Sequence, residues 1–116
     1  MKYLLLVCAD KAMELPAEES AALQRDALAW MKEMDDRGVR VRGHRLRDVS
    51  DATTVRMRNG EMLVADGPFA ETKEQIAGFD VLECADLDEA IEVARRHPMA
   101  RLGVLEVRPF WPFKED

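Results

Sequence analysis

A few residues in this sequence have side chains and positions that suit acid–base chemistry. His44 lies in an alternating segment, Asp80 lies in the middle of an apolar segment, and Glu106 and Arg108 share one face of a segment near the C-terminus. A histidine beside a carboxylate can act as a general base near neutral pH. A buried carboxylate must be paired or take up a proton. His44, Asp80 and Glu106 are therefore the candidate catalytic residues.

The second histidine, His97, has a simpler interpretation. It follows Arg95 and Arg96 and precedes Pro98, so we expect it to be a cation at the C-terminal end of a helix that the proline stops. The two histidines form no HxH, HxxxH or HxxE spacing, so no metal site is expected. The sequence also contains no glycine-rich nucleotide-binding loop, and we expect no cofactor.

The elements that must position these residues alternate between strands and helices. Residues 2–8 are apolar on both alternating faces, which is typical of a central strand. Residues 17–36 carry an apolar stripe of period 3.6, with Trp30 as the expected core anchor. Asp86 is the expected N-cap of a second helix. The remaining predicted strands are 39–47, 53–58, 61–65, 76–84 and 103–108.

The strand 39–47 has a basic face formed by Arg40, Arg42 and His44. Such a face can bind an anion. It can equally protect an edge strand from pairing with other chains, and we favour this second interpretation.

Asn59-Gly60 predicts a two-residue β-hairpin between residues 53–58 and 61–65. The resulting register places Val55, Met57, Met62 and Val64 on one apolar face. We expect this hairpin to lie at the margin of the main sheet, where it leads directly into the next loop.

Residues 66–75 form a loop of unusual composition. Asp66 precedes Gly67-Pro68, a combination that organises turns, so we expect its carboxylate to accept hydrogen bonds from backbone N–H groups of residues 66–72. Thr72 and Gln75 match a capping box and predict one helical turn.

The order βαβ, hairpin, βαβ is that of a ferredoxin-like α+β fold with an antiparallel sheet and two helices on one face. If the helices cover Phe79, Leu105 and Val107, the other face presents Asp80, Glu106 and Arg108 to a cleft, with Asp66 and Phe69 at its rim. The predicted ligand-binding residues are Asp66, Phe69, Asp80, Glu106 and Arg108.

A second copy of the chain is the simplest cover for that other face. The strand 2–8 needs apolar cover on both sides, and the tail 110–113 places three aromatic residues beyond the last strand. We therefore predict a homodimer with the cleft between two sheets.

Composition limits the remaining choices. With 116 residues, the chain is expected to be one domain, 1–116. The net charge of −6 argues against direct nucleic-acid binding. The apolar run at the N-terminus is too short for a signal peptide or a membrane span, which favours a cytoplasmic protein. Cys8 and Cys84 are expected to be free thiols at opposite ends of adjacent strands.

Several segments resemble the YCII-related proteins, and specifically the branch named for its DGPF motif. They are Asp66-Gly67-Pro68-Phe69-Ala70-Glu71-Thr72-Lys73-Glu74, Ala77-Gly78-Phe79, Asp86–Ala90 and Gly103–Pro109. The resemblance implies a ferredoxin-like domain that pairs into a dimeric α/β barrel. It also implies a functional link to an extracytoplasmic-function sigma factor. Relatives in the wider group use a His–Asp dyad, for which this sequence offers only His44 or His97.

Two functions remain open. One is a dimer that binds a small ligand between its sheets or acts in regulation with a sigma factor. The other is a small isomerase- or lyase-like enzyme acting on a small anionic or aromatic substrate, with a carboxylate and His44 as its machinery. An enzyme should combine a carboxyl of raised pKa with a histidine in one pocket, and a binding protein does not need that pair.

Overall fold

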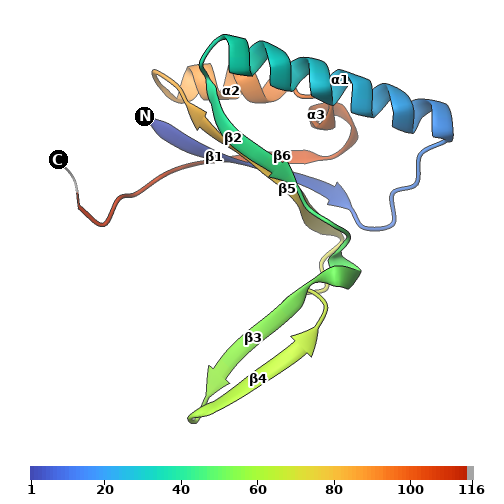
Figure 1. Cartoon of the computed structure of the whole chain (residues 1–116), viewed down its shortest axis with the longest axis vertical. Coiled ribbons are helices and arrows are strands. Elements are labelled where there is room, and N and C mark those ends of the chain that lie inside the picture. Colours follow the sequence, from blue (N-terminus) through green and yellow to red (C-terminus); the bar gives the residue numbers. More distant parts are fainter. Residues whose placement is uncertain (115–116) are drawn as a thin grey trace.

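The computed structural model describes residues 1–114, which form an α+β domain with one antiparallel four-stranded sheet (Figure 1). The sheet has the order β2-β5-β1-β6, and the hairpin β3–β4 forms a second sheet of its own. The strands are β1 (Lys2–Asp10), β2 (Arg40–Arg45), β3 (Thr53–Arg58), β4 (Glu61–Asp66), β5 (Glu74–Glu83) and β6 (Val104–Pro109). The helices are α1 (Ala17–Asp36), α2 (Leu87–Arg95) and the short α3 (Met99–Leu102), with a 3-10 turn at Val49–Asp51. The ferredoxin-like α+β prediction is confirmed; α3 was not predicted.

The central position of β1 is confirmed. Leu5 of β1 pairs with Asp80 of β5 on one side and with Val107 of β6 on the other, both antiparallel. All three helices lie on the same side of the sheet (Figure 1). The core between the layers contains Leu5 and Leu82 from the sheet and Met34 from α1, each fully buried.

Trp30 is the core anchor that the apolar stripe of α1 predicts. Its side chain is 3% exposed, and its indole Nε1 donates a hydrogen bond of 3.0 Å to the carbonyl oxygen of Val93 in α2. Because a buried indole N–H needs a partner, this bond lets the ring fill the core at little cost in desolvation. It also fixes α1 against α2.

The second helix begins as predicted. Asp86 is the N-cap of α2, and its carboxylate accepts a hydrogen bond of 2.9 Å from the backbone N–H of Glu89. Glu89 in turn accepts one of 2.9 Å from the backbone N–H of Ala85. Two backbone donors at the start of α2 are thereby satisfied by side chains.

The prediction for the face that carries Asp80 is wrong. The register aligns Asp80 with Leu5 and Val107, so Asp80 lies on the helix-covered face, while Phe79 lies on the other. Leu105 and Val107 do pack against the core, as expected. Residue alternation correctly separates Phe79 from Asp80, but the pairing of β5 with β1 decides which of them faces the helices.

The face of the sheet opposite the helices has an apolar centre and charged margins. The pairings place Leu4 and Leu6 of β1 beside Val81 and Phe79 of β5 in the centre of this face. The margins carry Arg42 and His44 on β2 and Glu106 and Arg108 on β6. We call this surface the open face.

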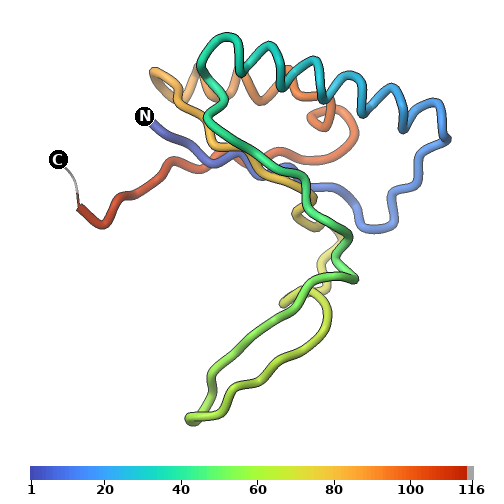
Figure 2. Tube along the Cα trace, viewed as in Figure 1, coloured from blue at the N-terminus to red at the C-terminus, as the bar shows by residue number. Residues whose placement is uncertain are grey.

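The hairpin has the predicted register but not the predicted place. Val55 pairs with Val64 and Met57 pairs with Met62. The hairpin is separate from the main sheet and projects away from it on the side opposite the helices (Figures 1 and 2). All four side chains are more than half exposed. The hairpin is therefore an arm, joined to the body only at its base.

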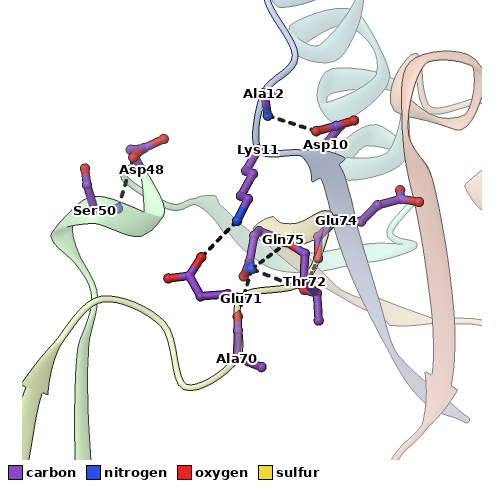
Figure 3. Close-up of polar contacts among 10 residues, drawn as sticks. All are labelled: Asp10, Lys11, Ala12, Asp48, Ser50, Ala70, Glu71, Thr72, Glu74 and Gln75. Atoms are coloured by element: carbon purple, nitrogen blue, oxygen red, sulfur yellow. Dashed lines mark hydrogen bonds and ion pairs between the residues drawn. The ribbon is translucent and has the colours of Figure 1, made fainter.

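The loop 66–75 is ordered by side chains without forming a helical turn, so the capping-box prediction is wrong. The amide Nε2 of Gln75 donates to the carbonyl oxygens of Ala70 and Thr72 and lies 3.1 Å from the hydroxyl of Thr72 (Figure 3). Strand β5 begins at Glu74, so these residues close a turn before a strand. Lys11 pairs with Glu71 at 2.9 Å and connects the loop to the end of β1.

Candidate functional site

A cavity of about 600 Å³ lies between α1 and the helix-facing side of the sheet. Its walls come from α1, from the C-terminal half of β1, from β2, from the middle of β5, and from His97 and Met99 after α2. Most of the lining is apolar, and it includes Val7, Leu23, Ala27, Met31 and Met99. The polar residues of the lining include the buried Asp80, Arg40 and His97, together with Ser20, Gln24 and Arg45.

Asp80 forms a buried ion pair with Arg40. Arg40 Nε lies 2.7 Å from Asp80 Oδ1, and both side chains are about nine-tenths buried. The same guanidinium donates to the carbonyl oxygen of Gly43 at 3.1 Å and to Asp35 at 3.1 Å. Arg40 is thus engaged on all three nitrogens, which holds it rigidly beside the cavity.

This partner for Asp80 was not predicted. Strict alternation along β2 puts Arg40 on the same face as Arg42 and His44, but the pairing of β2 with β5 is irregular between Arg40 and Arg42. Such an extra residue in a strand is a β-bulge, and it turns the residues on either side of it to different faces. Arg40 therefore turns towards the helices, while Arg42 and His44 stay on the open face.

Gly43 provides the space for the Asp80 carboxylate. A Cβ atom at this position would lie 2.0 Å from Asp80 Oδ1 and 2.7 Å from the carbonyl oxygen of Phe79. Any larger residue would displace the carboxylate or the backbone of β5. A glycine within a strand is consistent with such a close approach.

Burial raises the pKa of the Asp80 carboxyl above its ordinary value, and the hydrogen bond and charge of Arg40 oppose that rise. Asp80 therefore combines burial, a fixed cationic partner and a cavity at its side. Groups perturbed in this way are concentrated at functional sites, although structural ion pairs show the same perturbation.

His97 is buried and not the helix-terminal cation that the sequence predicts. The side chain is 8% exposed and its ring contacts the edge of Trp30, with a centroid distance of 4.7 Å. Its Nδ1 accepts a hydrogen bond of 3.0 Å from the backbone N–H of Met99. Burial lowers the pKa of His97 to about 4, so the ring is neutral at pH 7 and carries its proton on Nε2.

Two polar atoms of these buried residues are free to meet a ligand. Asp80 Oδ2 and His97 Nε2 have no hydrogen-bond partner in residues 1–114. Within the same residues no enclosed side-chain nitrogen or oxygen lacks a partner, so both atoms must touch open space. The cavity is the space that both residues line.

The other predicted catalytic residues do not meet Asp80. The ring of His44 lies 5.9 Å from that of Phe79, and no acid of residues 1–114 bonds to it. His44 and Glu106 occupy the two margins of the open face, with Phe79 and Leu6 between them. Three strand spacings separate them by about 14 Å. Glu106 instead pairs with Arg108 at 2.6 Å, and this exposed pair contributes little to stability.

Asp66 and Phe69 lie apart from the cavity lining. The predicted hydrogen bonds from the turn to Asp66 are absent from residues 1–114. Instead, the backbone N–H of Gly67 donates to Ala52 at 2.7 Å, and Thr54 Oγ1 donates to Gly67 at 2.8 Å. Phe69 is 79% exposed. The loop thus closes the base of the arm by main-chain contacts.

Further features of residues 1–114 bear on the class of site. They contain no group of three or more His, Cys, Asp or Glu side chains placed to hold a metal ion. No helix in this range has both the length and the apolar composition needed to cross a bilayer. Cys8 and Cys84 are both free, as expected.

The fold and the comparisons define the class of protein. The family model described as "YCII-related domain" matches residues 1–114, so the chain belongs to the YCII-related family. An uncharacterized protein of Rhizobium meliloti (strain 1021) is 41% identical over 99 residues, which cover 84% of this chain and 80% of that protein. The resemblance to the YCII-related family is therefore confirmed.

Proposed function

We propose that this protein binds a small, mainly apolar molecule in the cavity between α1 and the sheet. The observation that carries the proposal is the cavity itself, whose volume of about 600 Å³ suits a small molecule. Apolar walls with a few convergent polar groups are the usual composition of such sites. The proposed site differs from the cleft between sheets predicted above, because Asp80 and Arg40 lie on the helix side.

A ligand screen with two matched variants tests this proposal. Ala27 lines the cavity, and Ala29 lies exposed on the same helix outside the lining. Leucine at either position preserves helix propensity, but only Ala27→Leu narrows the cavity. A fragment that binds the folded protein raises its melting temperature, and we expect Ala27→Leu to abolish that rise while Ala29→Leu preserves it. An equal rise in the melting temperature of both variants would contradict the proposal.

We also propose that a second copy of the chain covers the open face. Leu4, Leu6, Phe79 and Val81 occupy its centre, and the helices all lie on the other side (Figure 1). The tail adds Trp111 and Phe113, which are 88% and 110% exposed in one chain. Sedimentation at micromolar concentration should give the mass of two chains, and the mass of one chain would refute this part. The cytoplasmic location and the sigma-factor link stay predictions.

An isomerase- or lyase-like enzyme is the second candidate function. The observation that favours it is that Asp80, whose pKa burial raises, lines the same cavity as His97, while His44 lies on the open face. A carboxyl group of this kind can transfer a proton to and from a bound substrate. A ligand identified in the screen would then exchange a C–H hydrogen for deuterium in D₂O with the wild-type protein and not with Asp80→Asn. A ligand that gains no deuterium would support the binding function and not the enzyme.

A further inference from the structure

We infer that the ligand of the cavity is a neutral molecule that donates a hydrogen bond to Asp80 Oδ2 and accepts one from His97 Nε2–H. This inference rests on the proposed function, since it assigns a ligand class to that same cavity. An apolar body bearing a hydroxyl group can make either bond, because a hydroxyl can both donate and accept.

The acceptor is Asp80 Oδ2. Arg40 Nε bonds Oδ1 at 2.7 Å and leaves Oδ2 without a partner in residues 1–114. The side chain as a whole is only 9% exposed. A carboxylate oxygen held in such a place binds a donor strongly, because hydrogen bonds to charged acceptors exceed neutral ones in strength.

The donor is His97 Nε2–H. The backbone N–H of Met99 points at Nδ1 and fixes it as an acceptor, which leaves the proton of the neutral ring on Nε2. The edge contact with Trp30 holds the ring in place. His97 therefore presents one oriented donor to the cavity, from a side chain that is more than nine-tenths buried.

The charges around Asp80 and His97 disfavour a charged polar group at that point of the cavity, and Arg45, the other charged residue of the lining, is exposed. Arg40 balances Asp80 directly, and the second carboxylate on Arg40, that of Asp35, is 49% exposed and lies on the solvent side of the pair. A ligand carboxylate would approach Asp80 Oδ2 and repel it. A ligand ammonium would be desolvated beside a carboxylate that already has its cation. Burial of an unbalanced charge is costly in either case.

Four naphthalene derivatives with one ring system test the inference: 2-naphthol, 2-methylnaphthalene, 2-naphthoate and 2-(aminomethyl)naphthalene. Their binding to the full chain at pH 7 is measured by ligand-observed NMR titration. We expect 2-naphthol to bind about tenfold more tightly than each of the others, which is the effect of one or two satisfied buried hydrogen bonds. Tighter binding of the carboxylate or the amine would overturn the inference.

Variants then assign the two bonds. Asp80→Asn keeps an oxygen for Arg40 and replaces the free acceptor with a donor. His97→Asn keeps an acceptor for the Met99 N–H and loses the Nε2–H, whereas His97→Gln keeps a donor near the Nε2 position. We expect the variant that removes the partner of the hydroxyl, Asp80→Asn or His97→Asn, to weaken 2-naphthol about tenfold and to leave 2-methylnaphthalene unchanged. If His97 is that partner, His97→Gln should bind closer to wild type than His97→Asn. No effect of either Asp80→Asn or His97→Asn would overturn the inference.

The outcomes separate the inference from the proposed function. If 2-naphthol and 2-methylnaphthalene bind equally and Ala27→Leu blocks both, the cavity binds ligands but the polar assignment is wrong. If Ala27→Leu leaves every probe unaffected, or if no probe binds, the cavity site and the inference both fall. Thermal melts of each variant, compared with wild type, show that a lost signal comes from the site and not from unfolding.

Discussion

Burial of neutral His97 should make the stability of this protein fall as the pH is lowered from about 7 to 5. The pKa of His97 is about 4 in the folded protein and 6.5 in the reference state. Below pH 6.5, His97 therefore becomes protonated in the unfolded chain but stays neutral in the folded chain until the pH approaches 4. When folding lowers the pKa of a histidine, the resulting stability is fully present above the pKa of the unfolded state. It is lost as the pH falls towards the pKa of the folded state.

The magnitude follows from the two pKa values. Each unit of separation corresponds to 1.36 kcal/mol, so a drop from 6.5 to about 4 amounts to about 3 kcal/mol in total. Between pH 7 and pH 5 the expected loss is about 2 kcal/mol. That is a large share of the stability of a domain of this size.

Urea denaturation at pH 5, 6 and 7 measures the effect. His97→Gln removes this titration. We therefore expect the free energy of unfolding of the variant to fall by about 2 kcal/mol less than that of wild type between pH 7 and pH 5. His44→Gln is the matched control, because it removes the exposed histidine and should preserve the wild-type slope. If wild type and His97→Gln lose stability in parallel, then His97 is not the buried neutral group described above.

Three further predictions concern the ion pair, the close approach at Gly43 and the tail. Arg40→Met leaves the Asp80 charge buried without its cation and should cost about 3–5 kcal/mol in the free energy of unfolding, whereas the exposed Arg42→Met should cost almost nothing. Gly43→Ala places a methyl group against Asp80 and the backbone of β5, and we expect a loss of about 1–3 kcal/mol in urea melts. A value near zero would mean that the carboxylate can move aside freely. Deletion of residues 110–116 should weaken the proposed dimer in sedimentation without lowering the melting temperature of the monomer, and an unchanged dimer would remove the tail from that interface.

The order of elements was predictable because the relevant signals are local. The apolar run of β1, the stripe of α1, the Asn59-Gly60 turn and the Asp86 cap each depend on residues close together in the sequence. The separate position of the arm was not predictable in the same way. The local pattern shows that the hairpin has an apolar face, but it does not show whether the main sheet covers that face.

The site was harder to predict because it depends on pairing between distant strands. Asp80 was assigned to the open face on the assumption that the helices cover Phe79 together with Leu105 and Val107. The bulge in β2 brings Arg40 to the helix side and makes the opposite arrangement stable. His97 was misassigned because it was grouped with its basic neighbours Arg95 and Arg96, which are exposed whereas His97 is buried. The ring is held by the backbone N–H of Met99 at the start of α3, a contact that no local sequence pattern reveals.

The central position of β1 also determines the order in which the chain can fold during synthesis. Leu5 leaves the ribosome among the first residues, but its partners are Asp80 and Val107. The arm needs only residues 53–66 and can close early, since hairpins form in microseconds and translation adds residues far more slowly. The apolar strand β1 therefore stays unpaired on both edges until nearly the whole chain has emerged from the ribosome. We therefore expect the nascent chain to engage a chaperone through residues 2–8, and the four-stranded sheet to form only once β6 is available.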